Sequence, residues 1–416
     1  MSKAFSDPRK LEYLNAEGAG RPLKSPIPLE TLKRARAYRK ARMVEQLIKH
    51  DCGAILLYDP INIRYATDVS NMQIWTAHIP FHYVLLFADG YTIDFAFRGS
   101  EHTATSLETV DEVRLGNPYL FIFTGSRMQD VAGAWADEIV DELKRRTGAN
   151  MRLAIDRLDH SGVDALRARG VSVVEGQELA ETARLIKCPE ELELMRWTIR
   201  VCEAGMARMY QNSVAGKTEQ EIWAELHYEN IRSGGEWIET RLLTVGQRTN
   251  PWFQECSDNV ARTGELVAFD TDMVGPYGYC ADLSRSWTVD HVPMTSEQRD
   301  IYMTSREQIE HNIGIVRPGM TFREFNERSW RIPERFGLHY GVALHGVGMV
   351  DECPALPVHP LWDRNIDDDV ITPGMTLCAE SLVGKVGGKE AVKLEAQFLV
   401  TETGVERLDT FPWEEG

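Results

Sequence analysis

Five carboxylates and one imidazole stand in otherwise apolar, strand-like segments of the C-terminal half of this chain, and they constrain its fold more than any other feature. They are Asp270, Asp272, Asp282, His345, Glu380 and Glu395. A charged side chain in an apolar segment is costly to bury unless it is paired or binds a metal ion. Any one of these acids could by itself be a surface or turn residue. As a set they favour a site for two divalent ions, with iron, manganese or zinc as candidates.

The spacing of the first three acids predicts a hairpin. Asp270 and Asp272 are two residues apart, so on a strand both would project from the same face. Residues 275–278 read Gly-Pro-Tyr-Gly, which is typical of a turn. The chain would then return on a second strand and bring Asp282 across from the first two acids.

A second hairpin is predicted around the two glutamates. Glu380 lies in an apolar stretch, glycines between 384 and 388 break the chain, and Glu395 follows in the next apolar stretch. His345 is followed by glycines that let another backbone approach closely. We therefore expect two related halves, one supplying aspartates and one supplying glutamates, to clamp a bimetal site between them.

The patterns along the chain predict three parts, namely an N-terminal arm at 1–28, an α/β domain at 29–186 and a C-terminal domain at 187–416. The arm is polar and contains several prolines and glycines. In the α/β domain, Asp89-Gly90 between two apolar runs is a strong hairpin signal. Pro189, followed by two glutamates, is a good first turn for a helix that opens the C-terminal domain.

Three capping boxes predict further helix starts in the C-terminal domain. They pair Thr218 with Glu221, Thr295 with Gln298, and Thr321 with Glu324. The order of two helices followed by strands then occurs twice, which again indicates two related halves.

Composition and charge argue against several classes of function. A formal net charge of −17 without a basic stripe disfavours a nucleic-acid partner. No apolar run approaches the ~20 residues that a membrane span needs, and the N-terminus lacks the apolar core of a secretory signal. The seven cysteines are odd in number and show no CxxC spacing, which predicts reduced thiols and a cytoplasmic location.

The acidic blocks resemble those of the pitta-bread metalloenzyme family, which includes methionine aminopeptidase, prolidase, aminopeptidase P and creatinase. The matching blocks are 264–270, 278–286, 345–348, 373–380 and 392–404. The resemblance implies an α+β chain in which a C-terminal pitta-bread domain follows an N-terminal α/β domain of the creatinase type. It also implies a homodimer with the cleft near the subunit boundary.

Three departures from the family pattern bear on the reaction. Trp252 and Phe253 stand where the family peptidases carry an upstream histidine, and Asp351 stands near where they carry a second one. Asp272 occupies a position that usually holds a small residue. Peptide hydrolysis has to protonate a poor amine leaving group. The loss of both histidines therefore disfavours a peptidase.

The same departures resemble one branch of the family, the dimethylsulfoniopropionate (DMSP) lyases. These release dimethyl sulfide and acrylate by β-elimination, and a sulfide that leaves as a neutral molecule needs no general acid. The resemblance implies two metal ions held by the six side chains named above, with iron expected and manganese or zinc as alternatives. It also implies Asp351 as the general base. If Asp351→Ala retained activity, Glu352 would become the candidate base.

A cationic sulfonium substrate also needs a receptor, and aromatic faces suit it. Tyr340, five residues before His345, is the first candidate. Trp75 could reach the site from the N-terminal domain of a partner subunit, and Trp252 could act in place of the missing histidine. Each of these rings could also be an ordinary core residue.

Two other functions stay open from the sequence. One is an Xaa-Pro aminopeptidase or dipeptidase-type dimetal hydrolase with an altered base. The other is a non-catalytic binding module. The complete set of acids argues against the module, because a module has no need of a buried acid cluster.

Overall fold

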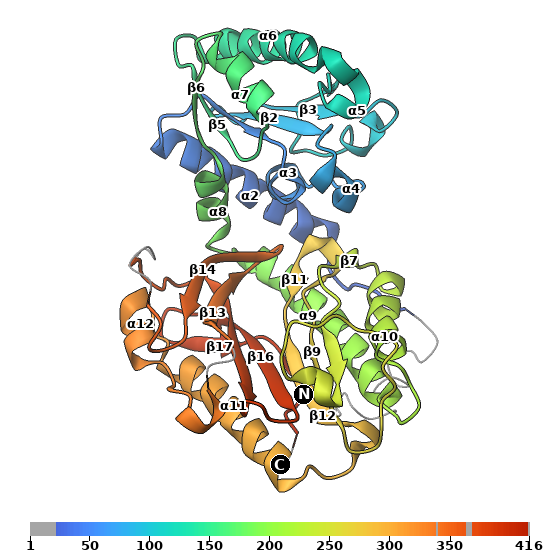
Figure 1. Ribbon diagram of the computed structural model, residues 1–416. Coiled ribbons are helices and arrows are strands. Elements are labelled where there is room, and N and C mark those ends of the chain that lie inside the picture. Colours follow the sequence, from blue (N-terminus) through green and yellow to red (C-terminus); the bar gives the residue numbers. More distant parts are fainter. Residues whose placement is uncertain (1–21, 338–339, 363–367, 415–416) are drawn as a thin grey trace. The chain divides into compact units, whose positions relative to one another are not determined.

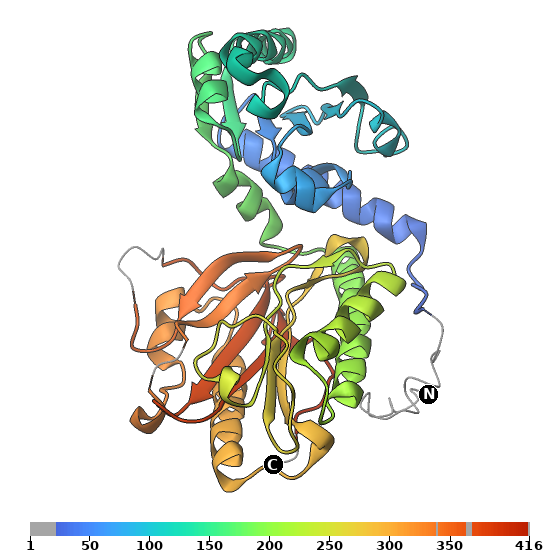
Figure 2. The same cartoon turned by 45° about the vertical axis from the view of Figure 1, so that its right-hand side comes forward.

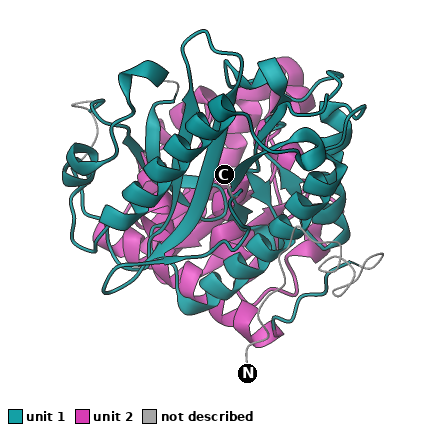
Figure 3. Ribbon diagram, turned by 90° about the horizontal axis from the view of Figure 1, so that it is seen from below, with its two compact units in different colours: residues 1–27, 185–416 teal, residues 28–184 magenta. Residues whose placement is uncertain are grey.

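The computed structural model describes residues 22–337, 340–362 and 368–414. It contains two compact units, which Figure 3 colours separately: unit 2 is residues 28–184, and unit 1 is residues 1–27 with 185–416. Most of the predicted N-terminal arm, residues 1–21, lies outside the described part of the chain. None of the described helices is long and apolar enough to cross a membrane.

Unit 2 is built on a six-stranded sheet in the order β4-β3-β2-β1-β5-β6. Its strands are β1 (Ala54–Leu57), β2 (Tyr83–Phe87), β3 (Thr92–Ala96), β4 (Glu112–Leu115), β5 (Arg152–Ile155) and β6 (Ser172–Glu175). Its α-helices are α2 (Leu29–Lys49), α3 (Pro60–Thr67), α4 (Gln73–His78), α5 (Phe121–Thr124), α6 (Met128–Thr147), α7 (His160–Arg167) and α8 (Gln177–Arg184). The hairpin predicted at Asp89-Gly90 is confirmed, since β2 and β3 pair antiparallel across it. Helices α6 and α7 cover one face of the sheet, and α2 and α3 cover the other (Figure 1).

Unit 1 contains four α-helices and three sheets in its described residues. The helices are α9 (Pro189–Asn212), α10 (Glu219–Arg232), α11 (Ser296–Ile315) and α12 (Phe322–Arg328). The sheets have the orders β11-β10-β7, β12-β9-β8 and β14-β13-β15-β16-β17. The strands are β7 (Trp237–Ile238), β8 (Leu243–Val245), β9 (Leu266–Asp270), β10 (Met273–Val274), β11 (Cys280–Ala281), β12 (Ser284–Thr288), β13 (Val342–Val347), β14 (Asp351–Pro357), β15 (Thr376–Gly384), β16 (Ala391–Val400) and β17 (Val405–Arg407).

The helix starts of unit 1 follow from local sequence. All three predicted capping boxes are confirmed, with Thr218, Thr295 and Thr321 each accepting a hydrogen bond from the backbone at the third helical position. Helix α9 begins at Pro189, as predicted. Each box satisfies backbone N–H groups that would otherwise lack partners at the helix end.

The predicted α+β class is confirmed, and unit 1 shows the expected repetition of two helices followed by strands. Helices α9 and α10 lie beside the strands β8, β9 and β12, and α11 lies against β15 and β16 (Figures 1 and 2). The β12-β9-β8 sheet meets the five-stranded sheet where β12 packs against β16. There the hydroxyl of Ser286 donates a hydrogen bond to the carbonyl of Lys393 over 3.0 Å. The predicted acidic ligands lie at this contact between the two sheets.

Candidate metal centre

The structure brings all six predicted ligand residues into one cluster. Three overlapping groups of side chains offer ligand atoms that all lie within 4.8 Å of one another inside each group. The groups are Asp282, His345, Cys378 and Glu395; Asp270, Glu380 and Glu395; and Asp270, Asp272 and Asp282. All of these side chains are buried except that of Asp272, which is half-buried.

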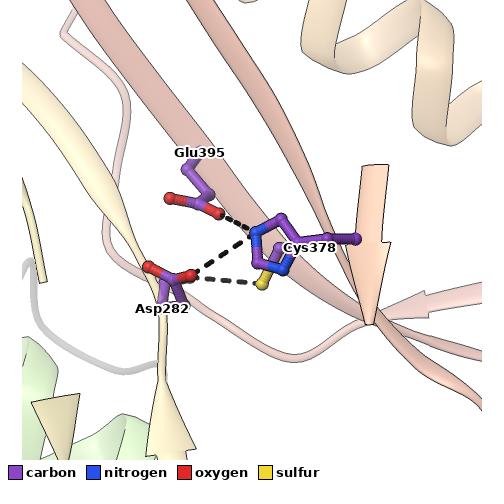
Figure 4. A group of neighbouring side chains, drawn as sticks. Asp282, Cys378 and Glu395 are labelled. Carbon is purple, nitrogen blue, oxygen red and sulfur yellow. Dashed lines mark hydrogen bonds and ion pairs between the residues drawn. The ribbon is translucent and has the colours of Figure 1, made fainter. Parts of the chain in front are cut away.

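The glutamate half of the cluster is set by strand register. Glu380 on β15 stands directly opposite Glu395 on β16, which confirms the predicted second hairpin. Their Oε1 atoms each lie 3.1 Å from Nε2 of His345, on β13. His345 pairs in turn with Cys378 on β15. Figure 4 shows Asp282, Cys378 and Glu395 pointing toward one another. Like charges directly opposite each other destabilise a sheet, so this pair of glutamates calls for a cation.

The aspartate half is arranged differently from the prediction. Strand β9 ends at Asp270, which is paired with Ser284 of β12. Asp272 lies after the strand and has a φ of 32°. The prediction that Asp270 and Asp272 share one strand face is therefore wrong, because the chain leaves the strand between them. Their carboxylates still meet, together with that of Asp282, which lies between β11 and β12.

The electrostatics of the cluster fit a bound cation. One oxygen of Asp282, Oδ1, is buried without a hydrogen-bond partner among the described residues. Burial raises the pKa of Asp282 well above its usual value, and the charge of Glu395 adds to this. Burial likewise raises the pKa of Glu395 to about 7. A divalent ion would reverse these shifts, since it favours the ionised carboxylate. The donor set of carboxylates and one imidazole suits such ions.

Lys393 is a member of the cluster that the sequence analysis missed. Its Nζ lies 2.7 Å from Oδ2 of Asp270, 2.8 Å from Oε2 of Glu380 and 3.2 Å from Oε2 of Glu395. Burial alone would raise the pKa of Asp270, but the charge of Lys393 and the side-chain hydrogen bonds of Asp270, including those to Lys393 and Ser284, together lower it. The signal in the sequence was the two-residue spacing from Glu395, which puts both side chains on one face of β16.

Asp351, the predicted base, lies beside the cluster at the start of β14. Its Oδ1 lies 3.5 Å from Nδ1 of His345, and its side chain is accessible to solvent. Partial burial against the cluster raises the pKa of Asp351, although much of its side chain stays in contact with solvent. His345 opposes that rise, and Glu380 adds to it. A carboxylate that is accessible and more basic than usual is suited to accept a proton from a small substrate.

Glu352, the alternative base, is engaged elsewhere. Its Oε2 lies 2.7 Å from Nζ of Lys187, and both side chains are buried. Its Oε1 accepts a hydrogen bond from the backbone N–H of Met349. A buried glutamate held by a lysine is less available to a substrate than the exposed Asp351.

Of the three predicted receptor aromatics, Tyr340 contacts an acid of the cluster directly, and Trp252 belongs to the apolar cluster against which Tyr340 packs. The hydroxyl of Tyr340 donates to Oε1 of Glu380 over 3.1 Å, and its ring centre is 5.7 Å from that of Phe253. Trp252 is buried in a small apolar cluster against which Tyr340 packs. Trp75 belongs to unit 2, where its ring contacts the rings of Phe81 and Phe97, which are residues of the same unit. Its role at the centre stays a prediction.

Comparison with known proteins places these residues in a known family. The profile of Metallopeptidase family M24 matches residues 193–402. The dimethylsulfoniopropionate lyase DddP of Roseovarius nubinhibens is 40% identical over 394 residues, which cover 93% of this chain and 88% of that protein. The lyase of the same name from Roseobacter denitrificans is 38% identical, with 93% and 88% covered.

The fold of a solved structure agrees with the expected pitta-bread architecture. The Xaa-Pro dipeptidase from Bacillus anthracis superposes with a TM-score of 0.72 at 20% identity, and the match covers 91% of this chain and 99% of that one. Identity at this level shows the shared fold alone.

Proposed function

The chain belongs to metallopeptidase family M24, and from that premise we propose that it is a metal-dependent dimethylsulfoniopropionate lyase. The observation that carries the proposal is Asp351, an accessible carboxylate with a raised pKa beside the acid cluster. The two similar proteins named as lyases of this substrate support it.

Asp351 is the proposed general base. It takes a proton from the carbon next to the substrate carboxylate, the electron pair of that C–H bond forms the new double bond, and the carbon–sulfur bond breaks toward sulfur. Dimethyl sulfide leaves as a neutral molecule, and acrylate remains. No proton donor is required for this leaving group, in contrast to the amine of a peptide.

The six acidic and imidazole side chains are the proposed ligands of two divalent ions, with iron as the proposed metal and manganese or zinc as alternatives. When bound, the ions supply positive charge that stabilises the negative charge developing on the substrate carboxylate. Tyr340 and Trp252 are the proposed receptors of the sulfonium, since a desolvated cation gains about 1–2 kcal/mol on an aromatic face.

A homodimer and a cytoplasmic location belong to the same proposal. Trp75 would then come to the centre from unit 2 of a partner copy. No disulfide joins any of the seven cysteines, all of which lie in the described residues, and this supports a reducing compartment.

The test is product formation by the purified, metal-loaded protein. We expect dimethyl sulfide in the headspace and acrylate in equal amount from DMSP, and no proline from Xaa-Pro peptides. The opposite pattern would replace the lyase by the peptidase that the fold also accommodates. A protein that neither turns over DMSP nor takes up metal would be the binding module instead.

A further inference from the structure

The cluster contains a cation of its own that the proposed reaction does not use. Lys393 is fully buried on β16, and its ammonium contacts Asp270, Glu380 and Glu395 at 2.7 to 3.2 Å. The same ammonium also donates a hydrogen bond to the hydroxyl of Ser284 over 3.1 Å. A lysine is almost never buried without partners. The burial of Lys393 is therefore explained by the three acids that surround its ammonium.

The ammonium of Lys393 contacts one oxygen of each of the three carboxylates, and the second oxygen of each contacts another group. Oε2 of Glu380 and Oε2 of Glu395 face Lys393, whereas their Oε1 atoms face His345 at 3.1 Å each. Oδ2 of Asp270 likewise faces Lys393, and its Oδ1 accepts the hydroxyl of Ser284. Lys393 therefore holds three carboxylates in a fixed orientation, with the second oxygen of each turned toward other partners.

The charges of the centre balance only when Lys393 is included. The predicted ligand set holds five carboxylates, and two divalent ions compensate four of these negative charges. Lys393 supplies the fifth positive charge. Burial of an uncompensated carboxylate charge is strongly unfavourable. Lys393 and the two metal ions together would therefore neutralise the five acids.

We infer that Lys393 is a positioning residue of the metal centre, a permanent third cation that keeps the carboxylates assembled and oriented for two divalent ions. The inference rests on the metal centre of the proposed function. It does not depend on which reaction the centre carries out.

The test measures the thermal midpoint, Tm, of Lys393→Met with chelator and with saturating divalent metal. In chelator we expect the variant to lose about 10 °C relative to the unaltered protein, because three buried acids lose their counter-charge. With metal we expect less than half of that loss, since the ions then supply most of the positive charge. An equal loss in both conditions, or no loss in chelator, would overturn the inference.

The matched control is Lys187→Met. This lysine is also buried and paired with a glutamate at 2.7 Å, but Glu352 is not in the cluster. Its loss should lower Tm by the same amount with and without metal. A metal-dependent loss in this control would mean that the Lys393 result reports general destabilisation and would overturn the inference.

A second variant guards against failure of Lys393→Met to fold. Adding Asp270→Asn removes the carboxylate nearest to the ammonium, so in chelator the double variant should regain at least half of the lost Tm. No recovery would show that Lys393 does not act through its charge. The metal-induced rise in Tm of the unaltered protein separately tests the metal centre, and DMSP turnover separately tests the lyase.

Discussion

At the scale of single residues, the proposed chemistry depends on which acids are accessible and which are buried with cationic partners. Asp351 is accessible and lies 3.5 Å from the imidazole of His345, whereas its neighbour Glu352 is buried on Lys187. Adjacent residues of a strand point to opposite faces, which explains why two consecutive acids have different surroundings. The sequence alone left the choice between them open.

Replacement of Asp351 tests its role as the base. In Asp351→Ala we expect kcat for DMSP to fall by about 10²- to 10⁴-fold, the range typical of a lost general base. Metal content measured by elemental analysis should stay near that of the unaltered protein. The control Glu352→Gln should lower stability, because Lys187 loses its charged partner, but retain turnover in the folded protein. Loss of activity in the control alone would move the base to Glu352.

At the scale of elements, the sequence predicted what local patterns encode. The capping boxes, the start of α9 at Pro189 and the hairpin that sets Glu380 against Glu395 were all predictable. For Lys393 the spacing from Glu395 indicated a shared strand face, but not burial, because a lysine on a strand is normally solvated. Its burial follows only from the way β16 meets β9 and β12, which are distant in sequence. The end of the strand at Asp270 was also missed. The backbone adopts a positive φ at Asp272, and the sequence has no glycine there to indicate it.

The pairing of β13 with β14 positions His345 and Asp351, and it leaves no room for a side chain at Gly346, which faces the backbone of β14. A Cβ on Gly346 would stand 2.3 Å from the backbone oxygen of Cys353. We expect Gly346→Ala to push the strands apart, to lower bound metal and to reduce turnover at least tenfold. Gly341→Ala, just before β13, is the matched control because a Cβ there meets nothing within 4 Å. Similar activity in both variants would contradict the requirement.

The clustered strands also predict how stability depends on pH when metal is removed. Glu395 has a pKa raised to about 7 by burial, so the folded state binds its proton more tightly than the unfolded state. Stability is then present at low pH and is lost as pH rises from about 4.5 to 7. Burial alone would lower the pKa of His345, but its bonds to Glu380 and Glu395 raise it, which adds a loss in the same direction above pH ~6.5.

This dependence can be measured as Tm in chelator between pH 5 and pH 8. We expect Tm to be higher at pH 5 than at pH 8. Saturating metal should weaken or reverse the trend, because the ions bind the ionised carboxylates. A metal-free protein that gains stability toward pH 8 would show that the acids are not buried together.

At the scale of the whole molecule, the chain folds into two units with separate cores, and the predicted site residues are divided unequally between them. Unit 1 contains all six proposed ligands and the proposed base, whereas Trp75 is the one predicted site residue that lies in unit 2. The order of elements was accessible from local sequence patterns, whereas the α+β fold class was implied by the resemblance of the acidic blocks to a known family. Whether Trp75 acts at a centre depends on assembly, which no single-chain pattern encodes.

The assembly prediction is a homodimer of twice 47.2 kDa in which Trp75 serves the partner's centre. We expect light scattering to report this mass. Trp75→Leu should raise KM for DMSP about tenfold with little change in kcat, through the loss of an aromatic contact to the sulfonium. Ile74→Ala, at an exposed position of the same helix, should leave both constants unchanged. A Trp75→Leu enzyme with unaltered KM would remove this residue from the site.

The most direct test of the account is a metal titration of the chelator-treated protein, with dimethyl sulfide release from DMSP as the readout. We predict no release without metal and a rise with added Fe²⁺ that saturates at two ions per chain. Full turnover by the metal-free protein, or none at any metal content, would contradict the claim that the acid cluster holds the ions on which the elimination depends.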